Sequence, residues 1–208
     1  MKRTHVLAKT ANLLIWLPAI VILFLFLADG LSFNPIGTAL HWMGRFAAGF
    51  FVLSLAVTPL VTLTGISSLA VLRRPLGLAA FYYASLHVLI YITLDQNFNL
   101  LQMWRSFTSQ PYIWIGAAAF LILIILGVTA LKKVMRKMGK RWKVLQRLAY
   151  LGVFAVLMHY AMARKGNLFT LQGDIVVPLT LLGITLVLLV LRLPFIRKGI
   201  LRLRKVST

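Results

Sequence analysis

Residues 76–94, LGLAAFYYASLHVLIYITL, and residues 147–163, RLAYLGVFAVLMHYAMA, are two apolar stretches that each contain one histidine. Each approaches the ~20 residues that a helix needs to cross the hydrocarbon core of a bilayer. A histidine at membrane depth is costly, and such residues usually have a functional role. His87 and His159 therefore link the fold class of this chain to its function.

The composition of the whole chain indicates a membrane protein. Its 208 residues are 61% hydrophobic and only 12% charged, and the mean hydropathy is +0.91. A soluble domain has about 25% charged residues. We therefore expect a polytopic membrane protein with no room for a separate soluble domain.

The residue types that are missing exclude several kinds of site. The chain has no cysteine, so disulfides, iron–sulfur clusters and thiolate zinc sites are excluded. Its acidic residues are Asp29, Asp95 and Asp174. Carboxylate-rich metal sites and hydrolysis by paired carboxylates are therefore implausible.

Apolar segments predict an all-α bundle of six transmembrane helices. These segments are residues 11–28, 44–64, 76–94, 112–131, 147–163 and 175–195. The first lacks a small-x-small cleavage site, so we expect a retained helix. The resulting domain organisation is an N-terminal tail (1–10), a transmembrane domain (11–195) and a basic C-terminal tail (196–208).

Basic residues alternate between the two sides of this bundle and predict its orientation. The N-terminus, the second loop, the fourth loop (132–143) and the C-terminal tail are strongly basic, whereas the other loops are not. The positive-inside rule then places both termini in the cytoplasm. The net charge of +20 is explained by this orientation and by lipid contact, and not by nucleic-acid binding. Binding of a phosphate-bearing ligand such as a flavin nucleotide is the alternative role of the fourth loop.

His87 and His159 are predicted to lie at nearly the same depth. Both helices run outward, and the histidines lie about 16 Å and about 18 Å from the cytoplasmic ends. Small residues precede each histidine, which leaves room for a flat macrocycle but also suits close helix packing. Two facing imidazoles can clamp a haem iron. The alternative is that both histidines only form interhelical hydrogen bonds.

Several short motifs in order carry a resemblance to a known family. They are Asn34-Pro35, His41-Trp42-Met43-Gly44-Arg45, Thr58-Pro59-Leu60, Arg73-Arg74-Pro75-Leu76-Gly77-Leu78, Leu86-His87, Gln110-Pro111-Tyr112, Gly139-Lys140-Arg141-Trp142, Tyr150-Leu151 and His159-Tyr160. Together, over about residues 11–200, they resemble the haem-binding membrane subunit of the periplasmic methionine sulfoxide reductase system. This is the MsrQ (formerly YedZ) family, within the ferric-reductase-like transmembrane superfamily.

The resemblance implies an electron-transfer subunit in the bacterial cell inner membrane. Such a subunit takes electrons from the respiratory quinone pool through b-type haem to a periplasmic molybdopterin-containing methionine sulfoxide reductase of the MsrP type. The partner would carry out the reduction that repairs oxidised proteins. The family is also described as using FMN. The haem ligands carry over to His87 and His159.

One departure from the family bears on the number of haems. Members can have a further histidine at the position of Gln146, and the wider superfamily holds a second haem with an inner pair of histidines. The other inner position is Arg73 here. We therefore expect one haem, near the outer face.

Four further residues are candidates for weaker roles. Arg45 could pair with a haem propionate or reach lipid phosphate, and His41 could be an alternative ligand, a quinone contact or an interfacial residue. Arg73 and Arg74 could contact a flavin or quinone, although orientation charges explain them as well.

Two other functional hypotheses remain open at this stage. One is a small polytopic transporter or scaffold without a cofactor, in which both histidines only pack. The other, a ferric reductase that uses NADPH, would need a cytoplasmic nucleotide-binding domain. The chain ends at Thr208, shortly after the last segment, so another subunit would have to supply that domain.

Overall fold

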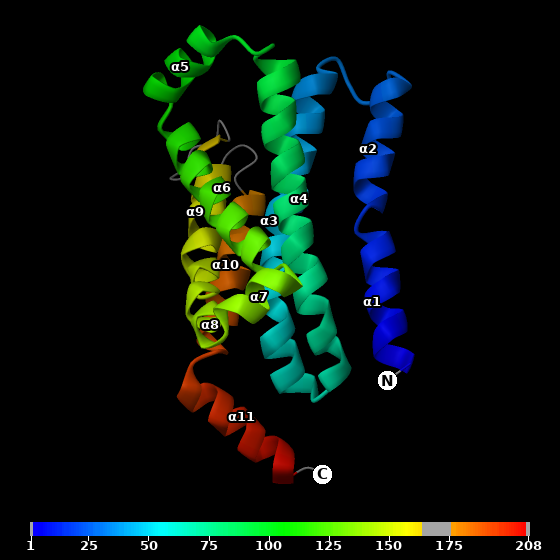
Figure 1. The fold of residues 1–208 in the computed structure, drawn as a ribbon, viewed down its shortest axis with the longest axis vertical. Helices are drawn as coiled ribbons and strands as arrows, with labels where there is room; N and C mark the ends of the chain where they lie inside the picture. The colour runs from blue at the N-terminus through cyan, green and yellow to red at the C-terminus, as the bar shows by residue number, and fades with distance from the viewer. Residues whose placement is uncertain (1, 164–175, 207–208) are drawn as a thin grey trace.

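The computed structural model describes the backbone of residues 2–163 and 176–206 and the side chains of residues 6–163 and 176–203. Every regular element in this part of the chain is helical (Figure 1). The elements are α1 (Lys2–Leu14), α2 (Leu17–Leu27), α3 (Pro35–Thr64), the 3-10 helix η1 (Ser67–Leu72), α4 (Arg73–Ile90), the π-helical turn η2 (Tyr91–Asp95), α5 (Leu100–Ser109), α6 (Pro111–Thr129), α7 (Lys132–Met138), α8 (Lys140–Leu145), α9 (Leu148–Ala163), α10 (Val176–Val190) and α11 (Pro194–Val206).

The long helices confirm the prediction of an all-α, polytopic membrane protein. Within the described residues, five stretches are long and apolar enough to span a bilayer, and α10 with α11 makes six if this pair, bent by 73°, is one span. The five are Val6–Leu27, Pro35–Thr64, Ser67–Asp95, Pro111–Thr129 and Lys140–Ala163. Both ends of the chain lie at the same end of the bundle, which we call the terminal end (Figure 1).

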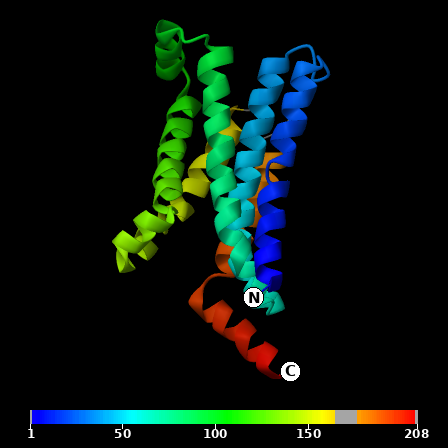
Figure 2. The same ribbon diagram turned by 45° about the vertical axis from the view of Figure 1, so that its right-hand side comes forward.

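Several boundaries differ from the sequence expectation. α3 begins at Pro35 and not at residue 44, because Asn34 caps it by accepting a hydrogen bond from the Gly37 amide and proline suits the first helical position. The predicted C-terminal tail is helical up to Val206, and α11 lies beneath the bundle (Figure 2). The predicted outer loop that contains Asp174 lies outside the described residues.

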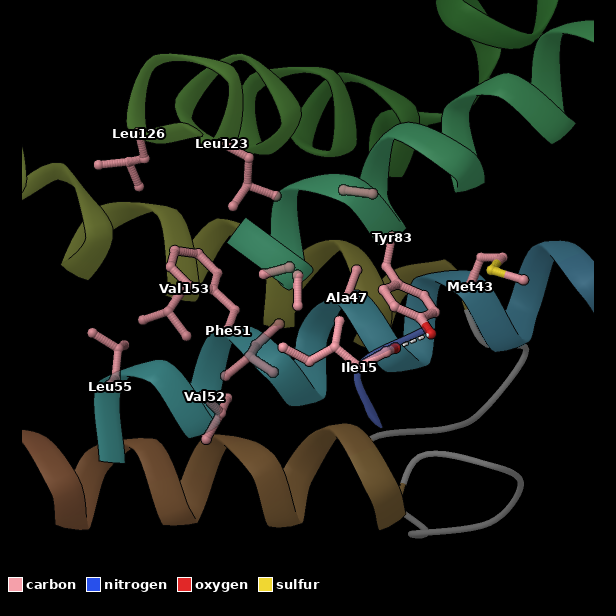
Figure 3. Close-up of a cluster of buried hydrophobic side chains, with 14 of the residues drawn as sticks. Ile15, Met43, Ala47, Phe51, Val52, Leu55, Tyr83, Leu123, Leu126 and Val153 are labelled. Carbon is pink, nitrogen blue, oxygen red and sulfur yellow. Dashed lines mark hydrogen bonds between the residues drawn. The ribbon is translucent and has the colours of Figure 1, made fainter. Parts of the chain in front are cut away.

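The core of the bundle is built around α3. This helix packs against α4 along its length and also contacts α2, α9, α10 and α11, while α6 packs against α9 and α4. Small buried residues such as Ala48 and Ala80 let α3 and α4 approach closely. Phe51, Tyr83 and Val153 fill the space between α3, α4 and α9 (Figure 3). The four helices α3, α4, α6 and α9 thus form the packed centre of the bundle.

Tyr83 compensates for a break in the first span. α1 ends at Leu14 and α2 begins at Leu17, with Pro18 in its first turn. The fully buried Tyr83 hydroxyl donates to the Ile15 carbonyl at 2.7 Å and accepts from the Ala19 amide at 3.0 Å (Figure 3). These two backbone groups are four residues apart and would bond to each other in an unbroken helix. The tyrosine therefore restores the hydrogen bonds that a broken helix cannot make in hydrocarbon.

Candidate functional site

His87 of α4 points at α3. Its Nδ1 lies 2.9 Å from the carbonyl oxygen of Leu40. Gly44, one turn further along α3, packs against the same ring, because a Cβ there would lie 3.2 Å from Nδ1. A helical side chain leans towards the preceding turn, so a glycine four residues after the carbonyl leaves that oxygen open to the imidazole.

His159 of α9 makes the same arrangement with α6. Its Nδ1 lies 2.8 Å from the carbonyl oxygen of Tyr112. Gly116, again four residues after that carbonyl, is even closer, since a Cβ there would lie 2.6 Å from Nδ1. The imidazole position in α9 thus depends on a glycine in a different helix.

The two arrangements repeat each other along the chain. In both, the histidine follows its carbonyl partner by 47 residues, and a glycine stands one turn after the carbonyl. The helix pair α3–α4 supplies one carbonyl, glycine and histidine, and the pair α6–α9 supplies the other three. Gly44 and Gly116 each precede the histidine that they contact by 43 residues, so the repeat includes the glycines as well.

The backbone carbonyls determine which ring nitrogen is free in each histidine. A carbonyl oxygen only accepts hydrogen bonds, so Nδ1 of His87 and of His159 must carry the hydrogen. The lone pair of each ring is then on Nε2, where it is available to a metal. This is the usual way in which a partner of the second nitrogen orients a ligating histidine.

The two rings meet between the helix pairs. Their centroids are 6.2 Å apart and their planes cross at 82°. Two imidazoles that bind one metal from opposite sides need centroids about 6 Å apart, given metal–nitrogen bonds of about 2 Å on each side. In the described part of the chain, no group of three or more His, Asp or Glu side chains is arranged to hold a metal. Two imidazoles would suffice as the protein ligands of a haem iron, because the macrocycle would provide the remaining ligands.

The pair lies towards the end of the bundle opposite the termini. α3 and α6 both begin at that end (Figure 1), and the carbonyls of Leu40 and Tyr112 are within their first two turns. The sequence predicted the two histidines at matching depth on separate helices, and the structure brings them together.

Arg45 and Tyr160 form a polar link beside the histidines. Arg45 follows Gly44, Tyr160 follows His159, and Arg45 Nε donates to the Tyr160 hydroxyl at 2.9 Å. The Arg45 guanidinium also lies over the Trp42 ring, 5.2 Å from its centroid. The sequence placed Tyr160 in the His159-Tyr160 motif but assigned it no role of its own. His41 is exposed on α3, one turn before Arg45.

The two inner positions, where other members of the superfamily can carry a second pair of histidines, are Arg73 and Gln146 in this chain. Gln146 donates to the Thr129 hydroxyl at 3.2 Å and to the Leu126 carbonyl at 3.4 Å, and so ties the start of α9 to the end of α6. Arg73 begins α4 at the terminal end and lines a pocket together with Arg192. Arg192 was not among the residues predicted from the sequence. Arg74 is exposed and does not line that pocket.

Comparison with known proteins agrees with this architecture. A model of the family "Ferric reductase like transmembrane component" matches residues 13–158, a region that includes His87 and ends one residue before His159. The magnetosome protein MamZ of Magnetospirillum gryphiswaldense is 42% identical over 130 residues, which are 62% of this chain and 20% of MamZ. This chain therefore spans about a fifth of the length of that relative.

Other relatives are similar to this chain over more of their length. The protein-methionine-sulfoxide reductase heme-binding subunit MsrQ of Agrobacterium fabrum is 37% identical over 148 residues, which are 71% of this chain and 68% of the relative. MsrQ of Brucella ovis is 37% identical over 150 residues, or 72% and 68%. The chain therefore belongs to the ferric-reductase-like transmembrane family and, within it, to the MsrQ group.

Proposed function

We propose that this chain is a membrane electron-transfer subunit that holds one b-type haem between His87 and His159. The observation that carries the proposal is the pair itself. Two imidazoles from different helices lie 6.2 Å apart, and each donates its Nδ1 hydrogen to a backbone carbonyl. The names of the MsrQ relatives, which are called heme-binding subunits, support the same cofactor.

The residues around the pair would hold the haem rigidly. Haem supplies reversible one-electron chemistry when bound. The carbonyls of Leu40 and Tyr112 orient the two rings, and the glycines that follow keep both rings close to α3 and α6. Arg45, which follows Gly44 in the chain and bonds to the neighbour of His159, would offer a positive charge to a propionate. A fixed ligand pair keeps the reorganisation on electron transfer small.

The route of the electrons is the finer part of the proposal. The chain would lie in the bacterial inner membrane with cytoplasmic termini, as the basic loops indicate. The histidines would then lie near the periplasmic face. Electrons would come from the quinone pool, with FMN as a second carrier, and pass to a periplasmic molybdopterin-containing methionine sulfoxide reductase of the MsrP type.

A single haem fits the inner positions of this chain. Gln146 is engaged with α6, and Arg73 carries a positive charge where an imidazole would be needed. Neither side chain is an ordinary haem ligand. We therefore propose a stoichiometry of one haem per chain.

The optical spectrum of the purified protein tests the proposal. Protein expressed with ample haem should show a low-spin Soret band that shifts on reduction, with one haem per chain by pyridine haemochrome assay. His87→Ala and His159→Ala should each lose the low-spin haem, because each removes one axial ligand. His41→Ala serves as the control, and it should keep most of the haem.

Two outcomes would reject the proposal. Colourless wild-type protein would favour a transporter or scaffold in which the histidines only pack. Normal low-spin haem in either alanine variant would show that the ligand assignment is wrong.

A further inference from the structure

A pocket of about 160 Å³ lies at the terminal end of the bundle, far from the histidine pair. It is lined by α3, the start of α4, α9 and the junction of α10 with α11. Its polar lining residues are Thr58, Thr62, Arg73, Tyr150, Arg192 and Arg197. A water molecule occupies about 30 Å³ in the liquid, so the pocket can hold a small polar group.

Arg192 is fixed in this pocket by a defect in α3. Pro59 has no N–H, so the carbonyl of Leu55, four residues earlier, has no helical partner. The Arg192 Nη2 donates to that carbonyl, and Nη1 donates to the Tyr150 hydroxyl at 2.9 Å. The guanidinium is therefore held in one orientation and is not a freely snorkelling side chain.

The Nε of Arg192 is buried without a hydrogen-bond partner among the described residues. A buried donor that is left unsatisfied destabilises the fold, and more so when the group is charged. Such groups are rare in folded proteins and usually indicate a missing partner such as a water or a ligand.

Two further arginines bring positive charge to the same pocket. Arg73 reaches it from the first turn of α4, and Arg197 reaches it because the chain bends by 73° between α10 and α11. No acidic side chain is among the described residues that line the pocket. A neutral ligand such as a quinone would leave three neighbouring guanidinium charges uncompensated, whereas a phosphate would compensate them with paired hydrogen bonds.

We propose that this pocket binds the phosphate group of an anionic ligand, either a lipid headgroup or a soluble phosphate. Arg73 and Arg197 flank the phosphate, and Arg192, held by the Leu55 carbonyl and the Tyr150 hydroxyl, supplies a preorganised guanidinium. The site is independent of the histidine pair. It would hold α11 against the bundle at the cytoplasmic side in the orientation proposed above.

Binding measurements on delipidated protein in detergent test the proposal and distinguish the two sources. Native mass spectrometry would count bound phosphatidylglycerol and, in a second arm, phosphatidylcholine. Equilibrium dialysis with inorganic phosphate would measure binding of the soluble anion. We expect one tight site, with preference for phosphatidylglycerol over phosphatidylcholine if the source is lipid, or saturable phosphate binding without lipid if it is soluble.

Charge-neutralising variants connect the binding to the pocket. Arg73→Gln and Arg197→Gln should each weaken it about tenfold, the loss expected for a hydrogen bond to a charged group. Arg74→Gln and Arg202→Gln are matched controls on the same two helices, outside the pocket, and should bind like wild type. Circular dichroism would verify that each variant is folded. Absence of both kinds of binding, or equal loss in the control variants, would overturn the proposal.

Discussion

Gly116 of α6 lies directly against the ring of His159 in α9. A Cβ on this glycine would be 2.6 Å from Nδ1 and 2.7 Å from Cε1 of the imidazole, closer than real Cβ contacts. Gly44 has the same relation to His87 at 3.2 Å. The two imidazole rings therefore owe their positions to glycines on neighbouring helices.

Substitution of Gly116 by alanine should displace the imidazole of His159 from the Tyr112 carbonyl and from the metal. Loss of a group that orients a ligand typically costs 10- to 100-fold in affinity, so we expect haem affinity to fall by about 10- to 100-fold. Gly44→Ala should have a smaller effect in the same direction, because its contact is looser. Haem content and the Soret position of the purified variants measure both effects.

Gly49→Ala is the matched control for these two variants. Gly49 lies in α3, and a Cβ there would meet no atom within 4 Å. Alanine is also the better helix former, so haem binding should be unchanged. Equal haem content in Gly116→Ala and Gly49→Ala would mean that the packing of Gly116 does not position the ligand.

Tyr83→Phe should destabilise the protein while the aromatic packing is kept. The hydroxyl bridges the buried Ile15 carbonyl and the half-buried Ala19 amide at the break between α1 and α2, and its removal leaves both groups without this partner. We expect a loss of about 1–3 kcal/mol in unfolding free energy. The melting temperature in detergent should fall, whereas Tyr82→Phe, at an exposed neighbour, should leave it unchanged. A melting temperature equal to that of Tyr82→Phe would argue against the bridge.

Arg192 and Pro59 should be energetically coupled through the Leu55 carbonyl. With Pro59 present, Arg192→Ala removes the side-chain donor to that carbonyl and should cost about 1–3 kcal/mol. In a Pro59→Ala background the new backbone N–H can bond Leu55, so the same substitution should cost less. A double-mutant cycle on thermal stability gives the coupling, which is about 0.5–3 kcal/mol for residues in contact. If the stability losses of the two single substitutions simply add in the double variant, Arg192 does not replace the missing partner of the Leu55 carbonyl.

The proposed orientation can be tested with single cysteines, because the chain has none of its own. Ser109→Cys lies at the exposed end of α5, and Ser67→Cys lies in η1 near the terminal end. A membrane-impermeant maleimide should label Ser109→Cys in intact spheroplasts and Ser67→Cys only after permeabilisation. The reverse pattern would place the histidine pair on the cytoplasmic side.

The positions of the membrane-spanning helices could be predicted from the sequence, because every such helix needs a long apolar stretch regardless of how the helices pack. The predicted fourth segment, residues 112–131, begins one residue after Pro111, where α6 starts. The start of α3 was misplaced, because apolarity alone gave residue 44 and the Asn34 cap was not used. The helical character of residues 194–206 was also missed, because the prediction relied on apolarity and these residues are strongly basic. Their apolar residues nevertheless recur at the spacing of an amphipathic surface helix.

The sequence by itself determined that this protein is a helical membrane protein and that His87 and His159 stand within apolar spans, because hydropathy and the positions of polar residues within it are local properties of the chain. Only the tertiary structure decided which nitrogen of each ring is free and which glycine each ring packs against. It also decided which carbonyl Arg192 caps. These relations join helices that are 43 to 137 residues apart in the chain, and only packing brings such groups into contact.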